Sequence, residues 1–319
     1  MHFLLCGKMF FLNRFLKIYS NMFNIPVLFL IFNRPDTTQK VFDVIKKQKP
    51  RYLYVAADGP RKNKTGEAEL CKKTREIAVQ IDWECELKTL FRDENLGCKM
   101  AVSSAITWFF EQVEYGLILE DDCLPDDTFF PFCEELLIKY KDDDRIGHIG
   151  GNNILPGIVR SDLSYDFCSI CHIWGWASWS RVWKNYDADF AYWNDGYGVR
   201  KHIFNNWREE VYFSSFLSDS IHVKHNINTW DAQYFFTLRA QNQLSIYPQK
   251  NLVTNIGCGT QGATHTGNVS STNVIEKESI AFPLKHPRYL TKNSTIDIQT
   301  FKKKFFSWKR LIRYIMNWY

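Results

Sequence analysis

The sequence lacks several patterns that would place it in a common class. It has no apolar run of ~18 residues, the length that a membrane-spanning helix needs, so no such helix is expected. The first 150 residues contain neither a Gly-x-Gly-x-x-Gly turn nor a Gly-x4-Gly-Lys-Ser/Thr loop, which disfavours a dinucleotide fold and a P-loop. The nine cysteines have no framework spacing, and Cys168 and Cys171 form a Cys-x-x-Cys without the second pair of a zinc site. We therefore expect reduced thiols, as in a cytosolic protein.

The chain also lacks internal repeats and a low-complexity linker. Its 319 residues suit one large domain or one and a half. The net charge of +5 is modest, and the basic residues gather at one end rather than across the chain, which gives little support to a nucleic-acid partner. The aromatic content of 16% is that of a packed globular protein in which some rings can line a pocket.

Strands and helices alternate over the first part of the chain. The apolar run 25–32 is short enough for a strand buried on both faces, and a turn and a helical pattern follow it. The same sequence of strand, turn and helix then recurs. We predict strands over 25–32, 52–57, 86–91 and from 115, and helices over 37–49, 67–81, 98–114 and from 129. This alternation predicts an α/β fold with a mostly parallel central sheet and helices on both faces.

The stretch 115–130 joins the fourth predicted strand to three adjacent carboxylates, Glu120, Asp121 and Asp122. Burying three carboxylates together without compensation is very costly. A divalent cation resolves that conflict, since Mg²⁺ is usually held by one or two carboxylates and by substrate phosphates. One interpretation is therefore a Mg²⁺ or Mn²⁺ site at the carboxyl end of a central strand, where open α/β sheets bind ligands. The other is a solvated acidic turn in which Asp126 caps the following helix.

Each predicted strand ends in a polar cluster. The carboxyl ends of neighbouring parallel strands lie at one edge of a sheet, so these clusters should converge on one crevice. An arginine can bind a diphosphate with two hydrogen bonds, and a carboxylate can accept one from a base or a ribose hydroxyl. The clusters are Asn33-Arg34, Asp58-Gly59, the stretch from Arg92 to Gly97, and the acidic triplet.

Further motifs follow the strand-end clusters along the chain. The set is 26–28 leading to Asn33-Arg34-Pro35, Asp58-Gly59, 120–122 followed by Phe129-Phe130, Trp174-Gly175-Trp176, Thr229-Trp230-Asp231 and Gly262-Ala263-Thr264-His265. Together these motifs resemble those of the GT-A glycosyltransferases, and most closely the N-acetylglucosaminyltransferase I type and related bacterial proteins. The resemblance covers about residues 25–268 and implies a GT-A, Rossmann-like fold. It implies a metal-dependent enzyme that moves a sugar, GlcNAc or another hexose, from a UDP-sugar or similar donor to a hydroxyl of a glycan or lipid-linked acceptor.

The resemblance implies roles for the residues of the donor site. Arg34 matches a basic residue that contacts the nucleotide, and Asp58 matches an acid that faces the uracil. Asp122 matches the carboxylate that ligates Mn²⁺ or Mg²⁺, and Glu120 and Asp121 match residues that touch the ribose and the sugar. Arg92 joins this nucleotide-sugar group because it follows the third predicted strand.

Asp231 and His265 are the remaining candidates for chemistry. Inversion by direct displacement needs a general base on the acceptor hydroxyl, and one carboxylate beyond the metal site suffices. The resemblance gives this role to Asp231, whose alternative is to cap a helix over 232–240. His265 matches a loop that closes over the diphosphate, either as a second metal ligand or as a hydrogen-bonded loop histidine.

Three tryptophans, Trp174, Trp176 and Trp230, are candidates for acceptor binding. An aromatic ring can stack on the face of a sugar, but it can equally well pack in the core. The stretch 171–183 holds more tryptophan than the resemblance leads us to expect, so the identity of the acceptor stays open.

We divide the chain into an N-terminal apolar and basic extension (1–22), the glycosyltransferase domain (23–290) and a C-terminal tail (291–319). Within the domain, 23–150 should bind the nucleotide-sugar and 151–290 the acceptor. The stretch 301–319 has six basic residues, no acidic residue and many apolar ones. It suits either a helix in an anionic membrane interface or a terminal helix packed on the domain. The first option predicts peripheral contact with the cytosolic face of a membrane.

Two other functions are possible. A nucleotidyltransferase is disfavoured, because the Gly-rich first turn with Arg and Lys that is typical of that class does not follow Phe32. A non-catalytic carbohydrate- or nucleotide-binding module with the same fold is the main alternative. The intact acidic triplet and Asp231 favour the transferase.

Overall fold

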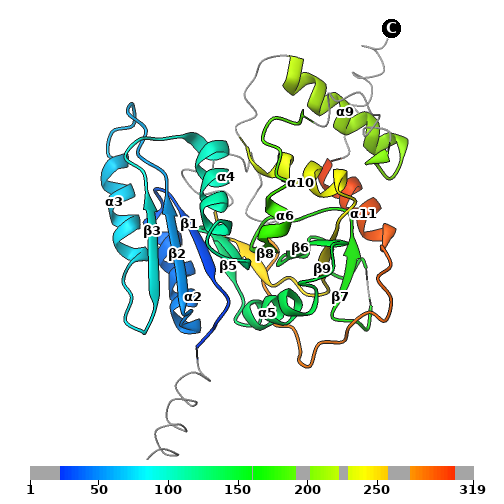
Figure 1. Cartoon of the computed structure of the whole chain (residues 1–319), viewed down its shortest axis with the longest axis horizontal. Coiled ribbons are helices and arrows are strands. Elements are labelled where there is room, and N and C mark those ends of the chain that lie inside the picture. The colour runs from blue at the N-terminus through cyan, green and yellow to red at the C-terminus, as the bar shows by residue number, and fades with distance from the viewer. Residues whose placement is uncertain (1–21, 160, 192–201, 223–228, 258–273, 306–319) are drawn as a thin grey trace, which may run out of the picture.

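The structure is a computed structural model that describes residues 22–159, 161–191, 202–222, 229–257 and 274–305 (Figure 1). The predicted extension, apart from Met22, and His265 lie outside these ranges. The strands within them are β1 (Val27–Ile31), β2 (Tyr52–Ala57), β3 (Glu86–Phe91), β4 (Tyr115–Glu120), β5 (Cys123–Pro125), β6 (Ile146–Gly150), β7 (Tyr165–Cys168), β8 (Trp176–Trp179), β9 (Leu244–Pro248) and β10 (Val253–Asn255).

The helices of the described chain begin and end close to the predicted bounds in the first half. Helix α2 starts at Pro35, two residues before its predicted start, because the fixed φ of proline suits the first turn. Thr128, and not Asp126, holds the N-cap position of α5, and Asp126 Oδ1 accepts from the Thr128 backbone N–H at 2.9 Å. The helices are α2 (Pro35–Gln48), α3 (Glu67–Ala78), α4 (Gly97–Phe110), α5 (Phe129–Lys139), α6 (Ser180–Trp183), α9 (Trp207–His222), α10 (Asp231–Ala240), α11 (Ser294–Thr300) and the π-helix η2 (Phe301–Phe305).

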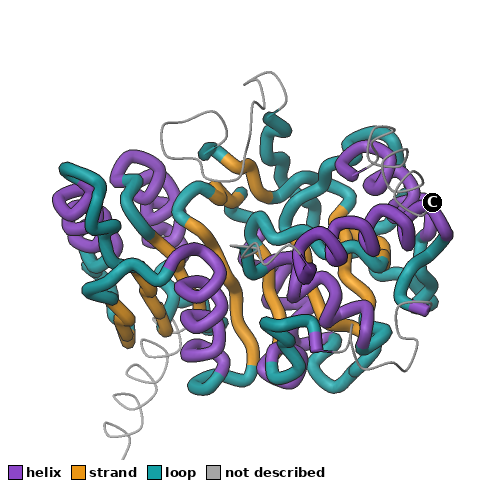
Figure 2. Tube along the Cα trace, turned by 90° about the horizontal axis from the view of Figure 1, so that it is seen from above, coloured by secondary structure: helices purple, strands orange, loops and turns teal. Residues whose placement is uncertain are grey.

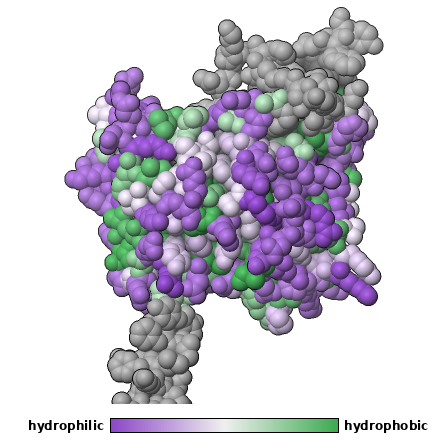
Figure 3. Space-filling view, in the orientation of Figure 1, coloured by the Kyte–Doolittle hydropathy of each residue, from purple (hydrophilic) through white to green (hydrophobic). Residues whose placement is uncertain are grey.

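Eight of the described strands form one mixed sheet in the order β3-β2-β1-β4-β8-β6-β9-β7. The pairs β1–β2, β2–β3, β1–β4 and β6–β9 are parallel, and β8 runs antiparallel to both β4 and β6. Helices lie on both sides of the strands (Figure 2), and the face of the molecule in Figure 3 is mainly hydrophilic with scattered apolar patches. The predicted α/β fold with a mostly parallel central sheet is therefore confirmed.

The two predicted halves of the domain share this sheet. Strand β4 of the first half pairs with β8 of the second, and the register places Leu117 opposite Ala177. All five residues of β1 are buried, as expected for a strand covered on both faces. The carboxyl ends of β1, β2 and β4 thus belong to a sheet that both halves build.

The first part of the predicted C-terminal tail packs on the domain. The Asn293 N–H donates to the Phe167 carbonyl at 2.7 Å, and Asp297 accepts from the Ser169 N–H at 2.9 Å. Ile296 and Phe301 are buried. Residues 306–319 lie outside the described chain, so the membrane interpretation of the tail stays a prediction. Within the described residues, no helix has the length and apolar character to cross a membrane.

A histidine in the core makes the stability of the fold depend on pH. His148 of β6 is fully buried, its ring stacks on Trp176 with centroids 5.4 Å apart, and its Nε2 lies 3.1 Å from the His172 carbonyl oxygen. Burial lowers the pKa of His148 from 6.5 to about 3. The folded protein therefore keeps this ring neutral at pH values at which the unfolded chain protonates it.

We expect the free energy of unfolding to fall as the pH decreases from 6.5 toward 3, because the unfolded state then binds a proton that the folded state excludes. The contribution of His148 should be about 1.4 kcal/mol per pH unit. Urea unfolding at pH 7 and pH 5 measures it, and His148→Phe should show a smaller difference between the two pH values. An equal difference in the variant and the wild type would contradict this.

Candidate active site

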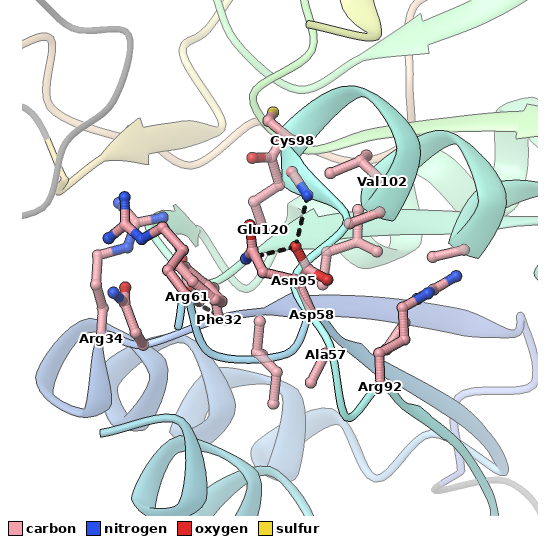
Figure 4. A pocket seen from close by; sticks show the side chains of 18 residues that line it. Phe32, Arg34, Ala57, Asp58, Arg61, Arg92, Asn95, Cys98, Val102 and Glu120 are labelled. Atoms are coloured by element: carbon pink, nitrogen blue, oxygen red, sulfur yellow. Dashed lines mark hydrogen bonds and ion pairs between the residues drawn. The ribbon is translucent and has the colours of Figure 1, made fainter. Parts of the chain in front are cut away.

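The carboxyl ends of β1, β2 and β4 form a cavity of about 190 Å³ (Figure 4). The three strands are parallel neighbours, and their register places Ile31 opposite Ala57 and Leu30 opposite Glu120. The polar clusters of the first half thus meet at one edge of the sheet. The lining residues include Asn33, Arg34, Asp58, Arg61, Arg92, Asn95, Glu120 and Asp121.

Arg34 binds two carboxylates of the acidic triplet. Its Nη1 lies 2.8 Å from Asp122 Oδ2, and its Nη2 pairs with Asp121 Oδ1. Burial opposes the charge of Arg34, but the negative charges of Asp121 and Asp122 outweigh it and raise the pKa of the guanidinium. The Phe32 N–H also donates to Asp121 Oδ2 at 3.0 Å. The arginine after the first strand therefore compensates part of the charge after the fourth.

The cluster keeps an excess of negative charge, because three carboxylates face one guanidinium. Asp121 is 2% exposed and Asp122 is 9% exposed. Burial, followed by the charges of Asp122 and Asp121, raises the pKa of Glu120 to about 8. Burial also raises the pKa of Asp121 to about 6, against the opposing effect of Arg34. A further cation at this position would lower the electrostatic cost of the ionised triplet.

The residues at this site fit a hard divalent cation that shares its ligands with a substrate. Among the described residues, no group of three or more His, Cys, Asp or Glu side chains is arranged to hold a metal ion by itself. Magnesium is commonly held by one or two carboxylates with substrate phosphates, and the oxygens of Asp121 and Asp122 match that requirement. No structural statement can be made for the predicted ligand His265, which lies outside the described chain.

Gly257 lies against Asp122, and the sequence motifs did not single it out. Strand β10 pairs with β5, and the Ile256 N–H donates to the Asp122 carbonyl at 2.8 Å. A Cβ at Gly257 would lie 2.3 Å from Asp122 Oδ2 and 2.8 Å from Arg34 Nη1, so only glycine fits there without displacing the ion pair. A glycine just after a short strand is a weak signal, and the pairing of β10 with β5 decides its place.

Asp58 lines the cavity, and both of its carboxylate oxygens accept hydrogen bonds within the protein. Its Oδ1 accepts from the backbone N–H groups of Gly59 and Leu96, both at 2.9 Å. Its Oδ2 accepts from Asn95 Nδ2 at 2.9 Å and from the Gly97 N–H at 3.1 Å. These bonds hold the start of α4 against the end of β2. The contact of Asp58 with a uracil stays a prediction.

Three arginines line the cavity. Figure 4 shows Arg34 and Arg61 on one side of it and Arg92 on the other. Arg61 binds Glu67, with Nε 3.0 Å from Oε2, and Arg92 Nη2 donates to Ser104 Oγ at 2.8 Å. Burial lowers the pKa of Arg92. Arg61 was missed because it lies in the polar loop after β2, where no periodic pattern marks it.

Two of the three tryptophans predicted to bind the acceptor lie in the core. Trp176 is 0% and Trp230 is 2% exposed, and the two rings stack on each other with centroids 5.7 Å apart. All four residues of β8 are buried, so Trp176 has no face left for a sugar. The interpretation of Trp176 and Trp230 as acceptor ligands is corrected to core packing. Trp174 is only partly buried and stays a candidate.

Asp231 is the first residue of α10, and its charge acts on two residues that line the cavity at the carboxyl ends of β1, β2 and β4. Trp230 holds the N-cap position, so the capping alternative does not describe Asp231. The Thr229 hydroxyl donates to Asp231 Oδ1. The charge of Asp231 contributes to the raised pKa of Glu120 and of Cys98, after burial in both cases. Glu120 and Cys98 both line this cavity. The charge of Asp231, from the second half of the chain, therefore raises the pKa of two residues in the first half.

Comparisons with known proteins give low similarity only. A scan against protein-family models and a search of curated proteins gave no match. Among solved structures, HddC from Yersinia pseudotuberculosis is 10% identical with a TM-score of 0.31, over 54% of this chain and 85% of that chain. A UDP-glucose pyrophosphorylase complexed with UDP-glucose is 9% identical with a TM-score of 0.36, over 73% and 94% of the two chains.

A cytidylyltransferase from Leptospira borgpetersenii is 11% identical with a TM-score of 0.32, over 70% of this chain and 98% of that chain. Similarities of this size assign neither a family nor an activity to the protein. Its function has to be inferred from its own residues.

Proposed function

We propose that the protein is a metal-dependent glycosyltransferase that moves a sugar from a nucleoside-diphosphate donor to a hydroxyl of a glycan or lipid-linked acceptor. The observation that carries the proposal is the group of three carboxylates and Arg34 at the carboxyl ends of β1 and β4, with Asp231 close by. An acidic site beside an anion-binding arginine suits a ligand that brings both phosphates and a metal ion.

The cavity at the carboxyl ends of β1, β2 and β4, which we call the donor cavity, has residues that suit a nucleoside diphosphate. Its lining includes small residues, Ala56, Ala57 and Ala101 among them, which leave room for a flat base. The guanidinium groups of Arg34 and Arg92 can bind phosphate oxygens. Arg34 would then share its donors between the diphosphate and the carboxylates that it binds now.

Asp122 and Asp121 would hold Mn²⁺ or Mg²⁺. When bound, the ion would supply positive charge to the diphosphate leaving group. The chain's own part at this point is to hold the two carboxylates in place, through Arg34 and through the Phe32 N–H. Gly257 limits the space beside Asp122, so the ion and the phosphates are expected to enter from the open side of the cavity.

Asp231 is proposed as the general base of an inverting displacement. The carboxylate would take the proton of the acceptor hydroxyl as that oxygen attacks the sugar. The hydrogen bond from Thr229 keeps Oδ1 in one orientation and leaves Oδ2 for the acceptor. A base of this kind must stand beside the donor site, where the charge of Asp231 already acts on Glu120.

The proposal is tested by hydrolysis of a panel of UDP- and GDP-sugars with Mn²⁺, with Mg²⁺ and with a chelator. We expect one donor to be hydrolysed with metal and the rate to fall to background with the chelator, since the acidic site alone repels a diphosphate. Failure to bind or hydrolyse any donor, with or without metal, would overturn the proposal. Donor binding without hydrolysis or transfer would indicate a binding module.

A further inference from the structure

A second cavity of about 280 Å³ lies beside Asp231, apart from the donor cavity. Helices α9 and α10, the segment 171–173 and the π-helix η2 contribute to its walls, and Figure 1 shows these helices together at one end of the molecule. Ligand pockets usually measure roughly 300–1,000 Å³, so this one is of a size for a small group such as one sugar residue. Its lining includes Tyr212, Phe213, Asp231, Phe235, Lys304 and Phe305.

The walls of this cavity are mainly aromatic. The Phe213 ring packs against the rings of Phe235 and Phe305, with centroids 5.1 and 5.4 Å apart, and Tyr212 lies 5.9 Å from Phe305. Phe305 and Tyr212 are only partly buried, so part of each ring faces the opening. Aromatic surfaces of this kind suit the apolar face of a sugar ring.

Two opposite charges lie on the walls. Burial and the charge of Asp231 raise the pKa of the Cys171 thiol to about 12, and the charge of Lys304 opposes this shift. Cys171 lines the same cavity, so both charges lie near one wall of it. Lys304 is exposed, and its Nζ lies 5.5 Å from the centroid of the Phe305 ring. Within the described residues, no carboxylate forms a salt bridge with it. The neighbouring Lys303, unlike Lys304, binds the main chain, because its Nζ donates to the Ile154 carbonyl.

Asp231 connects the two cavities. It lines the aromatic cavity, and its charge acts on Glu120 and Cys98, which line the donor cavity. A sugar in the aromatic cavity would therefore meet both Asp231 and Lys304. An anionic group on this sugar could form an ion pair with Lys304, whereas a neutral sugar could not.

We infer that the aromatic cavity is the acceptor subsite and that the acceptor is a sugar with a negative charge. The ring packs on Tyr212, Phe213 and Phe305, and the anionic group pairs with Lys304. This inference rests on the proposed function, because it takes Asp231 as the base. The anionic group is either the carboxylate of an acidic sugar or the phosphate of a glycosyl phosphate, two sources with the same chemistry toward a lysine.

The reaction balances without a further reactant. The acceptor hydroxyl oxygen forms a bond to the anomeric carbon of the donor sugar. The bond between that carbon and the diphosphate oxygen breaks, and its electron pair leaves with the nucleoside diphosphate. The hydroxyl proton goes to the Asp231 carboxylate, which later releases it to water.

The test compares acceptors that differ only in charge, with product formation measured by mass spectrometry. The probes are glucuronides and the matching glucosides, and hexose 1-phosphates and the matching methyl hexosides. We expect the wild type to use either the glucuronides or the hexose 1-phosphates with a KM at least about tenfold below that of the matching neutral sugar, because only the anionic sugar can pair with Lys304. A tenfold difference corresponds to about 1.4 kcal/mol. Lys304→Gln should remove this difference.

Lys302→Gln is the matched control, because Lys302 is exposed on the same π-helix and does not line the cavity. Binding of the same sugars is followed separately by saturation-transfer NMR, so a protein without donor turnover still reports on the cavity. Equal use and equal binding of anionic and neutral sugars, or no effect of Lys304→Gln on either, would overturn the inference while donor hydrolysis still supports the proposed function. Loss of donor hydrolysis with intact anion-dependent binding would overturn the function instead.

Discussion

Metal-dependent donor turnover should fall by about 10²–10³-fold when Asp122 is replaced by asparagine, a loss typical of removing one electrostatic contact to a developing charge. The carboxylate lies 2.8 Å from Arg34 and is only 9% exposed, so its charge acts at short range in a site with little water. The amide keeps the shape of the side chain and removes the charge. Hydrolysis of the selected donor at saturating metal measures the effect.

Asp127→Asn is the control for this substitution. Asp127 lies in the same loop but is half exposed and pairs with Lys47 at the surface, so donor turnover should stay within about twofold of the wild type. Thermal unfolding of both variants shows whether the fold is intact, because Asp122→Asn also leaves Arg34 with Asp121 as its remaining carboxylate partner in the described site. Wild-type turnover in a folded Asp122→Asn protein would remove Asp122 from the metal site.

Replacing Asp231 by asparagine should lower sugar transfer by about 10²–10⁴-fold, the usual contribution of a general base. Donor affinity should change little, since Asp231 lines the aromatic cavity and is not among the residues that line the donor cavity. The measurement is transfer to an excess of acceptor, together with a separate titration of donor binding. A loss confined to the transfer step would separate this residue from Asp122.

Two further variants make the result specific to Asp231. Asp189→Asn changes a carboxylate that is 90% exposed, so transfer should stay at the wild-type rate. Thr229→Val removes the hydroxyl that donates to Asp231 Oδ1 but keeps the carboxylate, so a smaller loss of transfer is expected. Should Asp231→Asn transfer as fast as the wild type, the assignment of the base is wrong.

The burial of the aromatic residues could not be predicted from the sequence. Trp176 and Trp174 are neighbours in one motif, yet Trp176 is fully buried and Trp174 is only partly buried. The reason is that β8 lies between β4 and β6 in the sheet and packs against α5 and α6, which no local pattern reveals. The rings of the proposed acceptor subsite, such as Phe213 and Phe305, come from different helices and share no sequence motif. These two residues are 92 positions apart in the sequence.

Some properties of this protein follow from the sequence alone. The α/β class and the strands 52–57 and 86–91 were predicted with the observed bounds, because strand-forming residues and the turn residues that flank them act locally. The meeting of Arg34 with the acidic triplet also follows, since the carboxyl ends of parallel strands share one edge.

The tertiary structure decided the rest. In the folded protein, backbone N–H groups donate hydrogen bonds to the carboxylate of Asp58. Gly257 lies against Asp122, and Asp231 lines the aromatic cavity. Each of these depends on long-range pairing, of β10 with β5 or of α10 with its neighbours, and not on local preference. A carboxylate in a motif has its charge from the sequence, but which donors or ligands it meets depends on the packing around it.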